Sequence, residues 1–324
     1  MIQRRQFLTR SALLAAAPWG ASFSATAWAQ DTTLRIVVGY PPGGSSDRVA
    51  RIVADKLQAA LGHAVIVENK VGAGGRISAQ YVKNAPASQP MLLLANPAVM
   101  VVSPLVVNDV GYDPVKDFVP VSEVNNYVFG VAVSTGVPVK ELSHLLAWLR
   151  ANPSQANIGV PATGSLPHFF ALMLGQRAQV TAEAVGYKGS APLLTDLIGG
   201  QVPVAVDTLD SLIPQHEAGK IRLLAVSSEQ RHPLVPKVPT LKEGGVQLAA
   251  SGWNTLFASK SLPQAQVDRY AGLIQKVMKD ADTQRLFKSS NLDPVAASAA
   301  QTRQRLTVYR QQWEPVIRNS GYRP

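Results

Sequence analysis

The chain lacks cysteine altogether and is poor in aromatic and charged residues. Without cysteine it can form no disulfide framework, thiol nucleophile or thiolate metal site. The histidines stand far apart, with no pair at i, i+4 and no carboxylate at ligand spacing, which argues against a structural zinc site. They are His63, His144, His168, His216 and His232. We therefore expect neither a metal nor a cofactor.

The basic residues do not cluster. The sequence holds 31 basic and 21 acidic residues, a formal net charge of +10, but the only adjacent basic pair is Arg4-Arg5. No RNA-binding, zinc-finger or basic-zipper pattern is present, so nucleic acid is not an expected partner. The 324 residues are 46% apolar and 6% aromatic, which is more chain than one core usually fills. A packed α/β protein of two domains is predicted.

Residues 1–29 predict a signal peptide. A basic start is followed by an apolar stretch and by the small-residue cleavage site Ala27-Trp28-Ala29, so we expect export to the periplasm. The run Arg4-Arg5-Gln6-Phe7-Leu8 resembles the twin-arginine pattern, and an ordinary Sec signal is the alternative. Removing residues 1–29 takes away three basic residues and no acid, which leaves a net charge of +7 on the mature chain.

Strands rich in β-branched residues alternate with amphipathic helices along the mature chain. This alternation predicts doubly wound parallel sheets that bind ligands at the carboxyl ends of their strands. The apolar segment 91–107 is interrupted by Pro97 and Pro104, so a buried strand, a loop and a short helix are expected there, not a membrane span. We place a first lobe at residues 30–130 and 227–324 and a second lobe at 131–226. The tail should hold two helices, at about 264–289 and 299–319.

Three glycine-rich loops follow strands and open helices: Pro41–Asp47, Thr163–His168 and Gly186–Ser190. A helix N-terminus presents unpaired N–H groups, so each loop is either an anion site or a simple helix cap. No dinucleotide fingerprint, P-loop or nucleophile elbow is present, and no spacing proposes a catalytic triad. The chain is therefore not expected to be an enzyme.

Three ionisable residues lie near these loops. Asp47 is expected first to complement a helix dipole and second to contact a ligand. His168 is expected to be a hydrogen-bonded structural histidine more readily than a catalyst. Asp207 follows an apolar strand, where it either contacts the ligand or caps the next helix.

Eight stretches follow one another along the chain: 36–47 (IVVGYPPGGSSD), 67–75 (VENKVGAGG), 112–118 (YDPVKDF), 164–168 (GSLPH), 185–192 (VGYKGSAP), 197–202 (LIGGQV), 218–227 (AGKIRLLAVS) and 236–244 (PKVPTLKEG). Together they resemble the substrate-binding proteins of tripartite tricarboxylate transporters, the Bug family of periplasmic receptors. The resemblance covers nearly the whole mature chain.

The resemblance implies a type II periplasmic-binding-protein fold, in which two doubly wound α/β lobes are joined by two crossover strands. It implies a receptor that captures a small carboxylate between the lobes and delivers it to membrane transporter subunits; we expect a monomer. Backbone N–H groups of the loops Gly43–Asp47 and Thr163–Ser165 would hold the carboxylate, and Asp207 would help to choose the distal part of the ligand. The expected ligand-binding residues are Tyr40, Pro42, Gly43, Gly44, Ser45, Ser46, Asp47, Asn96, Thr163, Gly164, Ser165, His168, Tyr187, Gly189 and Asp207.

Two alternatives stay open at this point: a sensor of the same fold that signals to a histidine kinase, and an exported enzyme built on this fold. The sequence also departs from the family. Arg48 stands where an aliphatic residue is usual, and it either enters the cleft to pair with a second carboxylate or faces solvent. The segment Pro86–Pro90 replaces the usual turn before the third strand, which leaves the role of Asn96 open.

Overall fold

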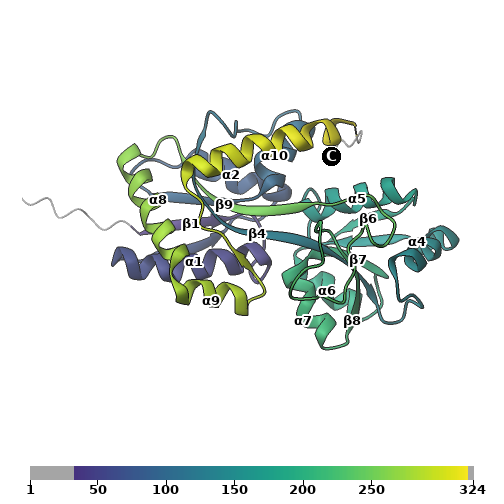
Figure 1. Cartoon of the computed structure of the whole chain (residues 1–324). Helices are drawn as coiled ribbons and strands as arrows, with labels where there is room; N and C mark the ends of the chain where they lie inside the picture. The colour runs from purple at the N-terminus through teal and green to yellow at the C-terminus, as the bar shows by residue number, and fades with distance from the viewer. Residues whose placement is uncertain (1–32, 320–324) are drawn as a thin grey trace, which may run out of the picture. The chain divides into compact units, whose positions relative to one another are not determined.

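Two mixed β-sheets, each packed between helices, form the two lobes of the fold (Figure 1). The structure is a computed structural model that describes residues 33–319, so the predicted signal peptide and its cleavage site lie outside the described residues. Within residues 33–319, no helix combines the length and the apolar character that a membrane span needs.

The first lobe is built on three parallel strands in the order β2-β1-β3, with β9 and β4 antiparallel beside them. Alternate residues of β1 enter different cores: Leu34, Ile36 and Val38 pack against α1 and α8, while Val37 packs on the side of α2. The elements are β1 Leu34–Val38, β2 Val65–Asn69, β3 Met91–Ala95, β9 Ser251–Ser259, β10 Asp293–Pro294, α1 Ser45–Leu61, α2 Arg76–Lys83, α3 Ser103–Val106, α8 Gln264–Lys279, α9 Ala281–Ser289 and α10 Ala299–Asn319, with short η1 Ala73–Gly75 and η2 Ala98–Val102.

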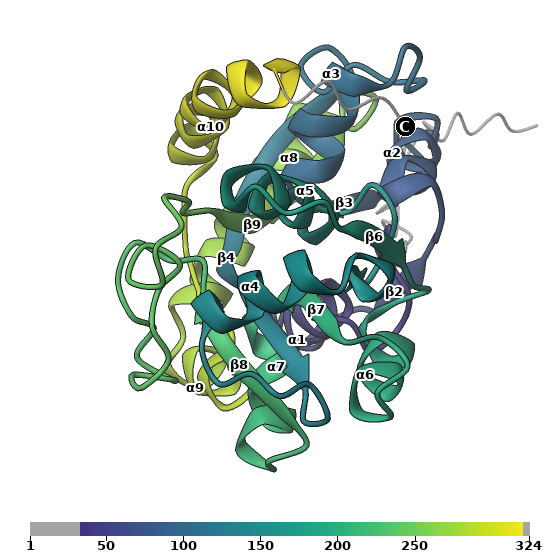
Figure 2. The same ribbon diagram turned by 90° about the vertical axis from the view of Figure 1, so that its right-hand side faces the viewer.

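The second lobe, which faces the viewer in Figure 2, repeats this plan with a smaller sheet. Its strands β7, β5 and β6 are parallel, and the end of β4 runs antiparallel to β7 and β8. Helices α6 and α7 pack on one face of the sheet and α4 and α5 on the other. The elements are β4 Phe118–Ser134, β5 Asn157–Val160, β6 Glu183–Gly186, β7 Val204–Thr208, β8 Ile221–Val226, α4 Leu142–Ala151, α5 Leu166–Ala178, α6 Ser190–Ile198 and α7 Leu209–Glu217, with short η3 Pro153–Gln155.

The strand–helix alternation is confirmed, but three details of the expectation are wrong. The sheets are mixed, because β4 is antiparallel to all of its partners. The apolar alternation of Val128–Ser134 predicts a strand, but β4 begins ten residues earlier, at Phe118, since its first half carries buried polar residues that local sequence patterns assign to a loop. The expected helix 264–289 is two helices, broken at Asp280, whose carboxylate accepts a hydrogen bond from the Thr283 N–H at 3.0 Å and caps α9.

Ser227 makes hydrogen bonds at the point where the chain leaves the second lobe. Its backbone N–H donates to the Phe129 carbonyl at 2.9 Å, and its hydroxyl accepts from the Phe129 N–H at 2.8 Å. The same hydroxyl donates to the Ala250 carbonyl at 2.6 Å, so it ties β4 to the segment that returns to β9. Ser227 is 1% exposed, and both of its hydroxyl partners are backbone groups that need a hydrogen bond.

We predict that Ser227→Ala lowers the free energy of unfolding by about 1–3 kcal/mol, because it leaves a backbone N–H and a backbone carbonyl without their partner. Ser228→Ala is the matched control, since the neighbouring Ser228 hydroxyl makes no hydrogen bond to any described residue. Urea denaturation of both variants measures the difference. Equal stability of the two variants would contradict this role of Ser227.

Candidate functional site

A small polar cavity, called here the inner chamber, lies where elements of both lobes meet. Its volume is about 60 Å³, room for a few water molecules or a carboxylate group. The first lobe contributes the turn between β1 and α1, and the second lobe contributes the β5–α5 turn and the first residues of α6. Of the expected ligand-binding residues, it is lined by Tyr40, Gly44, Ser45, Ser46, Asn96, Ser165, Gly189 and Asp207.

Helix α1 begins at the inner chamber without a side-chain cap. Its N-cap residue is Gly44, which has no side chain to accept a hydrogen bond. The N–H groups of Ser45 and Ser46 make no hydrogen bond within residues 33–319, and both residues line the chamber. The Ser46 hydroxyl is already engaged with Asn254 at 3.1 Å. Free N–H groups and the positive end of the helix dipole therefore lie at a small cavity lined by both lobes, which suits an anion.

Asp47 and His168 each accept a hydrogen bond from a backbone N–H of their own loop, the β1–α1 turn and the β5–α5 turn respectively. The Gly43 N–H donates to the Asp47 carboxylate at 2.8 Å, and the Gly164 N–H donates to His168 Nδ1 at 3.0 Å, each from four residues earlier in the chain. Arg51 adds an ion pair to Asp47 at 2.8 Å. Burial lowers the pKa of His168, in keeping with an unprotonated accepting Nδ1. Asp47 and His168 line neither the inner chamber nor the neighbouring larger cavity; they shape the loops that do.

Pro42 and Gly43 also line neither of these two cavities, and both are exposed. Gly43 adopts a φ of 82°, in the left-handed region that favours glycine, and its N–H is committed to the Asp47 carboxylate. Its contribution to the site is the shape of the turn that brings Gly44 and Ser45 to the chamber.

Asp207 is the buried carboxylate of the inner chamber, with 1% of its surface exposed. It lies within β7, and Thr208 occupies the N-cap position of α7. Its Oδ1 accepts a hydrogen bond from the Thr208 N–H at 2.7 Å, while Oδ2 makes no hydrogen bond to any described residue. The nearby Ser190 hydroxyl lowers the pKa of the Asp207 carboxyl, because it stabilises the ionised form. Burial is the main cause that raises the pKa of Asp207 to about 7.

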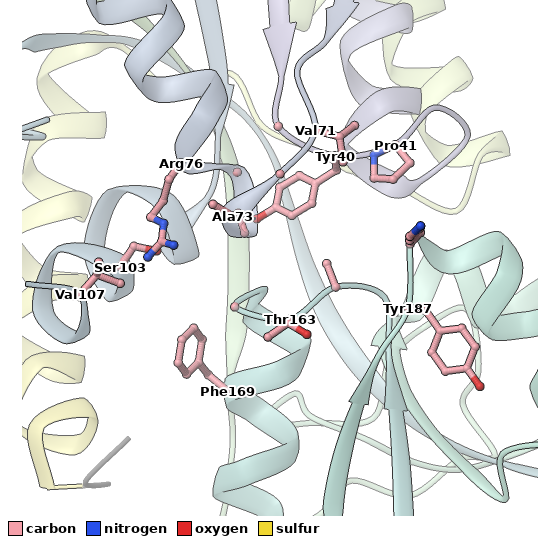
Figure 3. A pocket seen from close by; sticks show the side chains of 18 of the residues that line it. Tyr40, Pro41, Val71, Ala73, Arg76, Ser103, Val107, Thr163, Phe169 and Tyr187 are labelled. Carbon is pink, nitrogen blue, oxygen red and sulfur yellow. Dashed lines mark hydrogen bonds between the residues drawn. The ribbon is translucent and has the colours of Figure 1, made fainter. Parts of the chain in front are cut away.

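A second, larger cavity, called here the outer cavity, adjoins the inner chamber. Its volume is about 580 Å³, and it shares Tyr40, Pro41 and Gly189 with the chamber. Of the expected residues, Thr163, Gly164 and Tyr187 line it; the Tyr187 hydroxyl donates to Asp196 at 3.0 Å. Figure 3 shows residues of the first lobe, Arg76, Ser103 and Val107, on one side and Phe169 of the second lobe on the other. Sequence reasoning named none of these four.

Two glycines lie in close contact with the opposite lobe: Gly74 with the backbone of Gly164, and Gly189 with the ring of Pro41. A Cβ built on Gly74 would lie 2.9 Å from the Gly164 carbonyl oxygen, and one built on Gly189 would lie 3.3 Å from Pro41 Cγ. Contacts under 3.0 Å essentially never occur for a real Cβ, so no side chain fits between Gly74 and Gly164. The contact of Gly189 with Pro41 borders both cavities, whereas Gly74 and Gly164 line only the larger one.

Arg48 adds an ion pair between the lobes. Its guanidinium on α1 pairs with Asp210 on α7 and also donates to the Gly43 carbonyl at 3.1 Å. Asp210 is 4% exposed, and burial raises its pKa. The sequence left open whether Arg48 enters the cleft or faces solvent. The structure shows a third arrangement, in which Arg48 is committed to a carboxylate of the opposite lobe.

Comparison with known proteins identifies the family. A family model described as the tripartite tricarboxylate transporter family receptor matches residues 49–322. The chain belongs to this receptor family. The resemblance found in the sequence and the expected two-lobed fold are thereby confirmed, and this family and fold are those of binding proteins.

Relatives cover almost the whole chain. Protein BugT of Bordetella pertussis is 29% identical over 290 residues, 89% of each chain. The structure of R. palustris Rpa4515 with adipate is 29% identical, with a TM-score of 0.86 over 91% of this chain and 99% of that one. The periplasmic binding protein BugD is 26% identical, with a TM-score of 0.84 over 90% of this chain and 98% of that one.

We predict that Gly74→Ala holds the lobes apart, because its methyl group would overlap the Gly164 carbonyl. Gly219→Ala is the matched control: Gly219 also has a left-handed φ, of 68° against 65° for Gly74, but a Cβ there meets nothing within 4 Å. Both variants carry similar backbone strain of about 1 kcal/mol. With each variant saturated with its ligand, so that the lobes are driven to close, small-angle X-ray scattering should show a larger radius of gyration for Gly74→Ala alone. Identical radii in both variants would contradict the contact.

Proposed function

We propose that this protein is a periplasmic receptor that captures a small carboxylate in the inner chamber and delivers it to membrane transporter subunits. The observation that carries the proposal is the uncapped start of α1, whose free N–H groups lie at a chamber lined by residues of both lobes. A carboxylate oxygen placed there completes the hydrogen bonds that the helix lacks, without a cationic side chain. The family match and the relative with adipate support this class of ligand.

Closure of the two lobes is the step that gives such a site its affinity. In an open form, water solvates the N–H groups of Ser45 and Ser46. When the lobes approach one another, less water reaches these N–H groups, and each hydrogen bond to the ligand gains strength in the lower dielectric. A receptor of this kind thus closes on its ligand, and the transporter subunits would recognise the closed form.

Binding is tested first with a panel of mono-, di- and tricarboxylates and amino acids, because the proposal names a class of ligand. The protein is unfolded, freed of any retained ligand, refolded and screened by thermal shift, followed by calorimetry. At least one carboxylate should raise the melting temperature in a saturable manner. No binding by any acid of the panel would overturn the receptor proposal.

Delivery to the transporter is tested by deleting the gene and measuring uptake of the bound acid. Loss of uptake is the expected result; unchanged uptake would favour the sensor instead.

We predict that Ser45→Pro lowers the affinity for the bound acid by roughly 10- to 100-fold, since it removes an N–H that faces the ligand. Proline is compatible with the first position of a helix, and the preceding Gly44 is extended, with φ −73° and ψ 170°. Ser45→Ala is the control, because it removes the hydroxyl and keeps the N–H. Calorimetry compares the two; equal losses would show that the N–H is not the group that binds.

Asp207 makes the affinity depend on pH, and the direction distinguishes two kinds of ligand. An acid without an amino group favours protonated Asp207, so its affinity should rise as the pH falls from 8 to 6, through the pKa of about 7. An acid whose ammonium reaches Asp207 favours the ionised form and should show the opposite trend. Asp210 and Arg48, which also act on the pKa of Asp207, stay in place in Asp207→Asn. That variant should lose the dependence; a persistent slope would exclude Asp207 as its source.

A further inference from the structure

The outer cavity is far larger than one carboxylate needs. Its volume of about 580 Å³ falls within the range of roughly 300–1,000 Å³ that is typical of pockets for whole small molecules. Because it shares Tyr40, Pro41 and Gly189 with the inner chamber, a ligand held by one carboxylate at α1 has room to extend into it. A ligand longer than the chamber would therefore place its far end here.

The walls of the outer cavity are mostly apolar. Val71, Val106 and Val107 come from the first lobe, and Ala162 and Phe169 come from the second. Phe169 is 8% exposed and lies across the cavity from Val107 in Figure 3. Methylene groups of a ligand between these walls would be transferred out of water, which is favourable. A ligand chain that bears hydroxyl groups would find few hydrogen-bond partners there. The walls favour an apolar spacer.

The charged residues of this lining are all basic. Among the described residues that line the outer cavity, Arg76 and Lys188 carry charge, and no carboxylate accompanies them. Arg76 is half-buried at the start of α2 and points toward Ser103 and Val107 in Figure 3. Its guanidinium makes no hydrogen bond or ion pair with any residue in 33–319. A half-buried guanidinium with five free donors is suited to a planar anion, which it can bind through two parallel hydrogen bonds.

We propose that Arg76 binds the far carboxylate of an elongated dicarboxylate whose near carboxylate occupies the inner chamber and whose apolar spacer lies along Val107 and Phe169. The inference rests on the proposed function and adds to it the length and charge of the ligand. Arg48 cannot serve the far carboxylate in this conformation, because it is paired with Asp210. The receptor thus holds the two ends of its ligand by different means, backbone N–H groups at one end and a guanidinium at the other.

The test compares two acids with the same eight-carbon chain, suberate and octanoate, which differ in the far carboxylate. Wild-type protein should bind suberate roughly 10- to 100-fold more tightly than octanoate, the value of a charge-assisted contact. In Arg76→Met this advantage should vanish, while the affinity for octanoate stays within about twofold. Arg76→Lys should keep part of the advantage, because lysine keeps the charge and loses the paired hydrogen bonds.

Arg35→Met is the matched control, because Arg35 in β1 lies outside the lining of both cavities and its loss changes the net charge equally. It should leave the advantage of suberate unchanged. If both acids bind equally to the wild type, or if the advantage survives in Arg76→Met, the inference fails and the receptor proposal stands. If other carboxylates bind and neither of these acids does, the inference also fails. If no carboxylate binds at all, the proposed function itself fails.

Discussion

The first turn of α1 needs hydrogen-bond partners that its own sequence does not supply. Every helix begins with N–H groups that have no partner inside the helix, and a side-chain oxygen at the N-cap usually takes one of them. Here the N-cap is Gly44, and the residues that follow line a chamber to which the other lobe also contributes. The first turn of α1 thus lacks hydrogen-bond partners at a place where a small anion can supply them.

The other residues of the site position the first turn of α1 and the loops around it. Asp47 and His168 take the N–H groups of Gly43 and Gly164, which fixes the loops and leaves other N–H groups for the ligand. Gly74 and Gly164 let the lobes approach until no side chain fits between them, at the edge of the outer cavity. The Arg48–Asp210 ion pair adds an attraction between the lobes that is independent of the ligand. In this account, binding of the ligand and closure of the lobes are therefore coupled.

The local features of the site were predictable, because glycine-rich turns between strands and helices are short-range signals. The turn at Gly44–Ser46 is predicted in this way, whereas Asp207 is predicted from its place after an apolar strand and from the family resemblance. Local patterns did not reveal Arg76 and Phe169, since the two lie in different lobes and only the closed fold brings them to one cavity. The Gly72–Gly75 turn belongs to the stretch 67–75 that carries the family resemblance, but its role as the partner of Gly164 depends on long-range packing.

Buried polar residues explain the other large difference from expectation. The first half of β4 contains Glu123 and Asn125, which are 1% and 0% exposed and are typical of loops in a short-range pattern. Their partners are distant in sequence: Arg305 pairs with Glu123 at 2.7 Å, and Asn254 donates to Asn125 at 2.9 Å. The arrangement of Arg48 likewise depends on Asp210, 162 residues later. Contacts of this kind are set by topology, which the local sequence does not encode.

A crystal structure with the tightest-binding acid of the panel tests the central claim most directly. The account predicts a carboxylate oxygen of the ligand within about 3 Å of the backbone nitrogens of Ser45 and Ser46, with Gly74 and Gly164 in contact between the lobes. A ligand confined to the outer cavity, with only water at the start of α1, would contradict it.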